Sequence, residues 1–208
     1  MFDTLMRRLK DRLIEPLAAP LGSVSPNLLT LLGLLTGLTA AWLAAIGSVA
    51  PSLTVWILSR VIDGLDGLVA RRFNKQSDFG GYLDIVCDFA VYAAVPIGLT
   101  LAQPVTLNFI ALAVMLASFY INAASWMYLS ALLEKRAARD SSTQTSIIMP
   151  AGLIGGTESI TAFCFFLLFP AHIAPLFGIF SALVFVTVIQ RLIWAAHNLT
   201  PDTGKHGT

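Results

Sequence analysis

Four aspartates inside strongly apolar segments are the residues best suited to chemistry. Asp63 and Asp66 lie in one apolar segment, and Asp84 and Asp88 lie in the next. Ionisable side chains are costly to place within a membrane, so they indicate a functional site by default. On a helix, spacings of three and four residues place each pair on one face. The sequence therefore predicts two acidic helix faces, each carrying two carboxylates.

A short polar loop joins the two acidic segments, so their helices are expected to be antiparallel neighbours whose acidic faces converge. Four carboxylates in one space would repel one another strongly unless cations neutralised them. Hard divalent ions prefer oxygen ligands of this kind. We therefore expect Mg²⁺ or Mn²⁺, as a pair of ions, and the predicted ligands are Asp63, Asp66, Asp84 and Asp88.

Glycines and arginines in the same stretch allow two interpretations. The glycines are Gly64, Gly67, Gly80 and Gly81. They remove side-chain bulk where a ligand approaches the backbone, and Arg71 supplies a forked cation suited to a phosphate. Alternatively, Arg60, Arg71 and Arg72 form buried ion pairs with the aspartates that only hold helices together. Three arginines would match four carboxylates at a heavy desolvation cost, and such pairs would not need the glycines, so ligand binding is favoured.

The elements that position these residues are predicted to be membrane helices. Of the 208 residues, 56% are hydrophobic and 12% are charged, and the mean hydropathy is +0.77. These values are typical of an integral membrane protein. Segments of about 20 apolar residues can cross a bilayer, and the candidates are residues 27–47, 51–71, 80–102, 105–132, 147–169 and 173–197. The predicted fold class is all-α: one domain over residues 1–208, with a bundle of six transmembrane helices over residues 27–197.

Charge patterning predicts how this bundle is oriented. Basic residues gather before the first span, after the second, after the fourth and around the end of the sixth, whereas the other connections carry no charged residue. By the positive-inside rule, both termini and the acidic faces lie on the cytoplasmic side. Residues 2–18 alternate leucines and charges at helical spacing, which predicts an amphipathic helix in the membrane interface, or else a soluble helix that caps the bundle. The net charge of +1, without a basic patch, argues against a nucleic-acid partner.

The segment from Asp63 to Asp88 resembles the signature of the CDP-alcohol phosphotransferases. That signature is DxxDGxxAR(x)8GxxxDxxxD, and this chain carries all eight of its fixed positions. The chain length, the six predicted spans, the N-terminal helix and the Pro26, Asn27, Thr30 pattern that opens the first span are also similar to the family. The resemblance therefore extends over nearly the whole chain.

The resemblance implies a magnesium- or manganese-dependent enzyme of phospholipid biosynthesis. Such an enzyme transfers a phosphatidyl-type group from a CDP-linked lipid (CDP-diacylglycerol) to a small polar alcohol and releases CMP. By the resemblance, Asp88 is a metal ligand or the general base that takes the hydroxyl proton, and the other three aspartates are ligands. The implied nucleotide-binding positions are Gly67, Ala70, Arg71, Gly80, Asn27 and Thr30, although the last two could simply start and pack the first span. A homodimer embedded among membrane lipids is also expected from the resemblance.

The acceptor alcohol is less well defined by the sequence. Family members that use phosphorylated acceptors, such as glycerol 3-phosphate or inositol phosphate, tend to carry Lys or Arg directly after the last motif aspartate, whereas this chain has Phe89. Tyr92 and Pro96 follow at offsets that look more like the serine- and choline-using branches. A serine- or choline-like acceptor is therefore slightly favoured.

Three residues are candidates for the acceptor pocket. Glu158 falls about one third into the predicted fifth span, where a buried carboxylate would bind the acceptor or pair two helices. Arg139 and Arg191 lie near the predicted cytoplasmic face and suit an acceptor phosphate. The positive-inside pattern is the alternative explanation for both arginines.

Two other functions are compatible with an acidic helix pair. An intramembrane prenyltransferase also uses aspartates and Mg²⁺ on a diphosphate, but two separate aspartate-rich motifs in a longer bundle would be expected. A cation transporter would use the acidic faces as an ion path. Such a transporter does not need the glycines or Arg71, and the internal repeat that transporters often show is absent from this sequence.

Overall fold

The protein is represented by a computed structural model, which describes residues 15–139 and 152–199. Its elements are η1 (Ala19–Leu21), α2 (Pro26–Ala45), α3 (Val49–Arg72), α4 (Asp78–Ala102), α5 (Thr106–Arg139), α6 (Gly156–Leu168), η2 (Pro170–His172) and α7 (Ile173–Leu199). Within the described residues there is no strand. The predicted all-α fold class is therefore confirmed.

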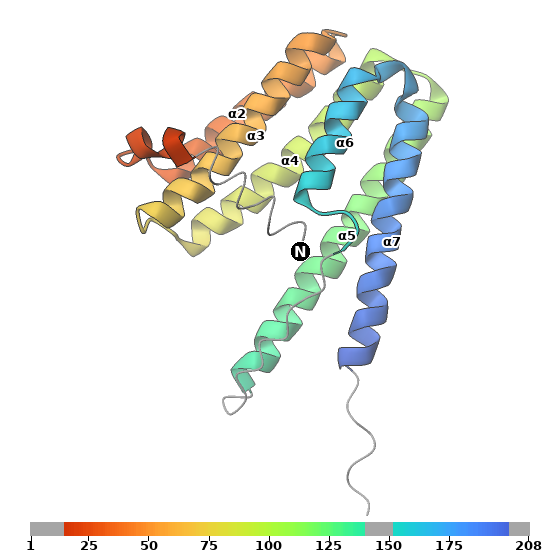
Figure 1. Ribbon diagram of the computed structural model, residues 1–208. Coiled ribbons are helices and arrows are strands. Elements are labelled where there is room, and N and C mark those ends of the chain that lie inside the picture. The colour runs from red at the N-terminus through yellow and green to blue at the C-terminus, as the bar shows by residue number, and fades with distance from the viewer. Residues whose placement is uncertain (1–14, 140–151, 200–208) are drawn as a thin grey trace, which may run out of the picture.

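The helices end at residues whose backbone preferences stop a helix. Gly47 lies between α2 and α3 with φ of 75°, and Asn74 lies between α3 and α4 with φ of 52°. Glycine adopts positive φ without strain and asparagine tolerates it. Ser77 then caps α4, because its Oγ accepts a hydrogen bond from the backbone N–H of Gly80 at 3.0 Å. These turns reverse the chain twice and pack both α3 and α4 against α2 (Figure 1).

Among the described residues, four helices are long and apolar enough to cross a membrane, namely α2, α4, α5 and α7. The chain is thus an integral membrane protein, as predicted. The other two predicted spans do not meet the same criterion. α3 carries five charged residues, which are Arg60, Asp63, Asp66, Arg71 and Arg72. α6 has 13 residues, or about 20 Å of helix, which is less than the apolar thickness of about 30 Å, so the count of six spans remains a prediction.

The predicted fifth span and the predicted N-terminal helix are only partly covered by the described residues. The prediction that a span begins at residue 147 is wrong for residues 152–155, which are not helical, and α6 begins only at Gly156. Residues 147–151 of the predicted span lie outside the described part of the chain. So do residues 2–14 of the predicted amphipathic helix, of which only residues 15–18 are described, and these are helical. The interfacial role of that helix and the single domain over residues 1–208 remain predictions.

Close packing joins α2 to both α3 and α4. Small residues of α2 allow this approach, because a Cβ at Gly37 would lie 2.6 Å from the methyl groups of Val91 in α4. Ser52 Oγ and Ser59 Oγ of α3 donate hydrogen bonds to α2 carbonyl oxygens, at 2.8 and 2.9 Å. Small residues and interhelical hydrogen bonds are the usual means of association in a membrane. The backbones of α3 and α4 make few close approaches to each other, and this separation leaves space for a site between them.

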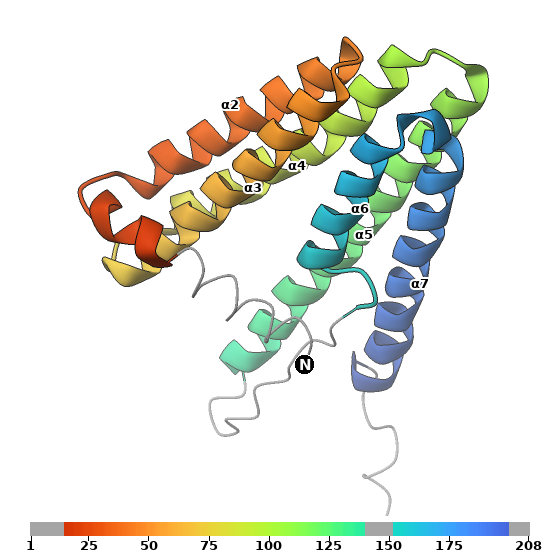
Figure 2. The ribbon, with the colours of Figure 1, turned by 45° about the horizontal axis from the view of Figure 1, so that its top comes forward.

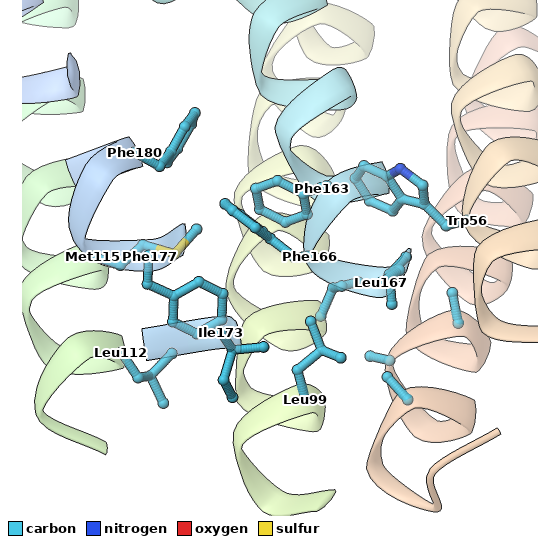
Figure 3. Close-up of a cluster of buried hydrophobic side chains, with 14 of the residues drawn as sticks. Trp56, Leu99, Leu112, Met115, Phe163, Phe166, Leu167, Ile173, Phe177 and Phe180 are labelled. Carbon is cyan, nitrogen blue, oxygen red and sulfur yellow. The ribbon is translucent and has the colours of Figure 1, made fainter. Parts of the chain in front are cut away.

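A second group of helices packs beside the first. α5 and α7 run side by side, and α6 lies between that pair and the α2–α3–α4 group (Figures 1 and 2). Aromatic side chains fill the junction (Figure 3): Phe163 of α6 stacks on Trp56 of α3 with ring centroids 5.0 Å apart, and Phe166 contacts Phe177 and Phe180 of α7. This core fixes the position of α3 relative to the rest of the bundle.

The basic residues lie at one end of the molecule. The α3–α4 turn and the C-terminal ends of α5 and α7 all point toward the lower side of Figure 2, opposite the other connections. Arg136 at the end of α5 donates to backbone oxygens of Asn198 and Leu199 at the end of α7. Arg72 pairs with Glu15 at 3.2 Å. The connections that are predicted to be cytoplasmic thus lie toward the same side of the described bundle.

Candidate metal and nucleotide site

Three of the four motif aspartates form one acidic group. Asp63 and Asp66 of α3 and Asp84 of α4 each offer an oxygen, and these oxygens all lie within 4.8 Å of one another. Asp66 is 4% exposed. Carboxylate oxygens at this spacing fit a small divalent cation such as Mg²⁺ or Mn²⁺, and without a cation they would repel one another in a partly buried space. The donor set and its geometry therefore fit the predicted metal.

A residue from a third helix orients this group. Thr30 Oγ1 of α2 donates a hydrogen bond to Asp66 Oδ2 at 2.6 Å, and the threonine is 5% exposed. Partners of this kind hold a metal-binding carboxylate in the orientation that ligation requires. The sequence predicted Thr30 as a nucleotide contact, and the structure adds this role of supporting Asp66.

A cavity of about 180 Å³ opens beside the acidic group. All six predicted nucleotide-binding positions line it, together with Asp66 and Asp84: Asn27, Thr30, Gly67, Ala70, Arg71 and Gly80. Four further lining residues were not predicted from the sequence to contact a ligand: Pro26, Lys75, Gln76 and Ser77. Gly81, which the sequence analysis expected beside a ligand, also lines the cavity. Lys75, Gln76 and Ser77 lie in the loop that joins the two halves of the motif, and Pro26 precedes Asn27 at the start of α2.

Two glycines in the cavity wall stand where a side chain would crowd its neighbours. A Cβ at Gly67 would lie 3.1 Å from Arg71 Nη1. A Cβ at Gly80 would lie 3.0 Å from Ser77 Oγ and 3.1 Å from the side-chain oxygen of Asn27. The absence of these side chains leaves polar groups of α2, α3 and α4 at the wall of one small cavity, which suits a phosphorylated ligand.

Asp88, the fourth motif aspartate, has a different environment. The acidic group found among the described residues does not include it. Its Oδ1 accepts a hydrogen bond from Arg60 Nη1 of α3 at 2.6 Å, and the same nitrogen lies 3.7 Å from Asp63 Oδ1. Arg60 therefore pairs with Asp88, which is one of the arginine–aspartate contacts that the alternative interpretation expected.

The three acceptor-pocket candidates are not brought together. Glu158 lies in the first turn of α6, where its Oε2 accepts a hydrogen bond from the backbone N–H of Gly155 at 3.0 Å. It is a capping residue, and its predicted place one third into a span is wrong because the helix begins nine residues later than expected. Arg191 of α7 donates to Asn122 and Ser125 of α5. Arg139 is the last residue of α5, and its side chain lies outside the described part.

Comparison with known proteins decides the class of this site. A sequence model of the CDP-alcohol phosphatidyltransferase family matches residues 23–196. The chain belongs to this family. The match agrees with the resemblance that the motif had indicated, and it sets aside the prenyltransferase and transporter alternatives.

This CDP-alcohol phosphatidyltransferase is similar to proteins from bacteria and archaea. It is 37% identical over 175 residues to the inner membrane protein YnjF of Escherichia coli, and the alignment covers 84% of each chain. It is 28% identical over 200 residues to the archaetidylinositol phosphate synthase of Methanothermobacter thermautotrophicus, with 95% of this chain and 94% of that protein covered.

The fold of this CDP-alcohol phosphatidyltransferase is shared with a solved structure. The phosphatidylinositol phosphate synthase of Mycobacterium tuberculosis with CDP-DAG bound gives a TM-score of 0.66 at 21% identity, covering 95% of this chain and 99% of that one. The same protein in complex with manganese and citrate gives a TM-score of 0.65 at 21% identity, covering 94% and 93%. Family membership and the acidic group together confirm the prediction of a divalent metal cofactor, Mg²⁺ or Mn²⁺.

Proposed function

We propose that this protein transfers a phosphatidyl-type group from CDP-diacylglycerol to a phosphorylated polyol of the inositol phosphate class and releases CMP. The observation that carries the proposal is the cavity between α2, α3 and α4, because the acidic group and the forked cation of Arg71 border the same space. Two relatives are named as synthases of archaetidylinositol phosphate and phosphatidylinositol phosphate. The preference for a serine- or choline-like acceptor, which rested on Phe89, is corrected accordingly.

The cavity lining supports a binding role for each helix that contributes to it. Asn27 of α2 and Gly80 of α4 lie next to each other at the wall, and Gly67 lies next to Arg71 on α3. We assign the cytidine diphosphate to this cavity, with Arg71 donating hydrogen bonds to phosphate oxygens. A divalent ion bound by Asp63, Asp66 and Asp84 would supply positive charge to the same phosphates. A pair of ions, as the sequence analysis expected, remains part of the proposal.

Asp88 is assigned as the general base. In the reaction, the acceptor hydroxyl oxygen forms a bond to the lipid-linked phosphorus, and the bond from that phosphorus to the oxygen of the CMP phosphate breaks. The hydroxyl proton passes to the Asp88 carboxylate, and CMP leaves with the electron pair of the broken bond. Asp88 is suited to this task because its carboxylate is only partly buried, with its side chain 34% exposed.

Arg191 supports an acceptor that carries a phosphate. The residue is 7% exposed, and its Nε has no hydrogen-bond partner among the residues that the structure describes. The partners of its Nη1 are the uncharged oxygens of Asn122 and Ser125. Among the described residues no carboxylate pairs with this guanidinium. A guanidinium buried in this way is costly, and an anionic ligand would offset that cost. Arg139 remains a further candidate for binding the acceptor phosphate. We also propose that the site, the acceptor entrance and both termini lie on the cytoplasmic side of the membrane. The protein is further proposed to be a homodimer.

CMP release tests this function directly. Purified protein with Mg²⁺ and CDP-diacylglycerol is given inositol 1-phosphate, glycerol 3-phosphate, myo-inositol, serine or choline, each separately. We expect CMP release with inositol 1-phosphate, and its loss in Asp84→Asn. Asp78→Asn is the matched control, because Asp78 is exposed in the first turn of the same helix and outside the acidic group.

The outcomes separate the parts of the proposal. Release with serine or choline but not with inositol 1-phosphate would show that the corrected acceptor is wrong. No release with any of the five alcohols would overturn the assignment of CDP-diacylglycerol as donor. Equal loss of activity in Asp78→Asn and Asp84→Asn would remove the evidence for a specific acidic group.

A further inference from the structure

Arg60 is a buried cation that the reaction as described above does not use. It projects from α3, is 5% exposed, and lies within ion-pair distance of Asp88 at 2.6 Å and of Asp63 at 3.7 Å. A single nitrogen, Nη1, makes both contacts. Arg60 therefore connects the proposed general base to a member of the acidic group.

The guanidinium of Arg60 is held from three helices. Its Nη2 donates to Ser59 Oγ at 3.1 Å, and that hydroxyl in turn donates to the carbonyl oxygen of Gly33 in α2 at 2.9 Å. Its Cζ lies 4.9 Å from the ring centroid of Trp56 in α3 and 5.3 Å from that of Tyr92 in α4. A cation within about 6 Å of an aromatic face is attracted to it, and more strongly where water is excluded. These contacts hold the guanidinium in place independently of its two carboxylate partners.

Exposure differs across the Arg60–Asp88 pair. The side chain of Asp88 is 34% exposed, whereas that of Arg60 is 5% exposed. The carboxylate therefore lies closer to the surface of the described bundle, and the guanidinium lies deeper inside it. Arg60 is placed to direct Asp88 rather than to contact a substrate itself.

We propose that Arg60 is a positioning residue, which holds one oxygen of Asp88 so that the carboxylate is oriented to take the proton of the acceptor hydroxyl. This inference rests on the proposed function, in which Asp88 is the general base. The hydrogen bond from Arg60 Nη1 reaches Asp88 Oδ1 at 2.6 Å. A catalytic carboxylate whose orientation is not fixed by packing or by hydrogen bonds loses much of its effect.

The alternative is that Arg60 only neutralises charge so that α3 and α4 can pack. The two roles differ in what they predict for metal binding. Removal of the guanidinium takes a positive charge away from Asp63, so a folded variant will bind a divalent cation as tightly as the wild type or more tightly. A variant whose helices pack poorly will instead lose both metal binding and thermal stability.

The experiment compares Arg60→Met, Arg60→Lys and the control Arg72→Met in purified full-length protein. Arg72 is a matched control because it lies on the same helix and its ion pair with Glu15 is largely exposed, with side-chain exposures of 40% and 57%. The readouts are kcat and KM for CMP release with CDP-diacylglycerol and inositol 1-phosphate, Mn²⁺ affinity by titration, and the thermal unfolding midpoint.

Positioning predicts that Arg60→Met lowers kcat about 100-fold, changes the KM for CDP-diacylglycerol less than about 3-fold, and leaves Mn²⁺ affinity unchanged or increased. Arg60→Lys keeps the charge without the planar fork, so we expect it to restore kcat only in part. If Arg60→Met does not fold, Arg60→Lys decides, and full wild-type kcat in that variant would overturn the inference. So would wild-type kcat in Arg60→Met, or a loss of Mn²⁺ affinity in step with kcat. A wild-type protein that releases no CMP would instead refute the proposed function on which the inference rests.

Discussion

The hydrogen bond from Thr30 to Asp66 can be removed with little change in shape. Thr30→Val replaces the hydroxyl with a methyl group of similar volume, while Asp66 stays in place at 4% exposure. A hydrogen bond to a charged group contributes about 1.5–3 kcal/mol, which corresponds to a factor of about 10 to 150 in affinity. Partners that orient metal ligands have effects of about 10- to 100-fold. We therefore expect Thr30→Val to weaken Mn²⁺ binding by about 10- to 100-fold.

The assay is a Mn²⁺ titration of the purified protein, followed by the Mg²⁺ dependence of CMP release. Both curves should shift to higher metal concentration, and activity should recover substantially when metal is raised. Thr36→Val is the matched control, because Thr36 lies on the same helix and donates at 2.7 Å to the backbone oxygen of Leu32 on the exposed side. It should leave both curves unchanged.

Two results would refute this reasoning about Thr30. If Thr30→Val and Thr36→Val bind Mn²⁺ equally well, the 2.6 Å hydrogen bond does not orient Asp66. If metal binding is normal but the KM for CDP-diacylglycerol rises, Thr30 acts as the nucleotide contact that the family resemblance implied.

Three further predictions concern other contacts. Gly80→Ala places a methyl group 3.1 Å from the side-chain oxygen of Asn27, so the KM for CDP-diacylglycerol should rise while Mn²⁺ affinity is retained; an unchanged KM would place the nucleotide elsewhere. Gly98→Ala drives a Cβ into a backbone carbonyl of α2 and should lower the thermal unfolding midpoint, whereas Gly178→Ala, with open space around it, should not. Glu158→Ala removes the capping hydrogen bond of α6 and should cost about 0.5–2 kcal/mol of stability without changing the KM for inositol 1-phosphate. A raised acceptor KM at unchanged stability would return Glu158 to the acceptor pocket.

The acidic group could be predicted because helical periodicity is a local property. Spacings of three and four residues place Asp63 with Asp66 on one face whatever the rest of the fold does. The short loop then forces the next helix to return past the first, which brings Asp84 to the same space. The role of α2 was harder to foresee, since nothing in the spacing of residues shows that Thr30 reaches Asp66 across 36 positions of sequence.

The errors also have physical causes. Glu158 was placed inside a span because the apolar pattern continues from residue 147, yet Gly155 and Gly156 favour a helix start, and a carboxylate at the third helical position caps the free N–H groups there. That Asp88 binds metal with the other aspartates, as its spacing indicated, remains a prediction. Its pairing with Arg60 depends on the distance between α3 and α4, which α2 and the aromatic core set, and a one-dimensional pattern does not contain that distance.

The charged residues of α3 require partners in the bundle, and the same residues contribute most of the carboxylates of the acidic group. A helix with five charged residues is expensive among apolar neighbours unless each charge has a partner or faces water. Arg60 and Asp66 are buried with partners from its own or adjacent helices, Arg71 lines the cavity, and Arg72 reaches Glu15 at the surface. Such a helix depends on α2 in front of it and on the aromatic core behind it for its position. The neighbouring helices that supply partners for the charges of α3 therefore also orient its carboxylates. The acidic group and the proposed base are brought together when α2, α3 and α4 pack.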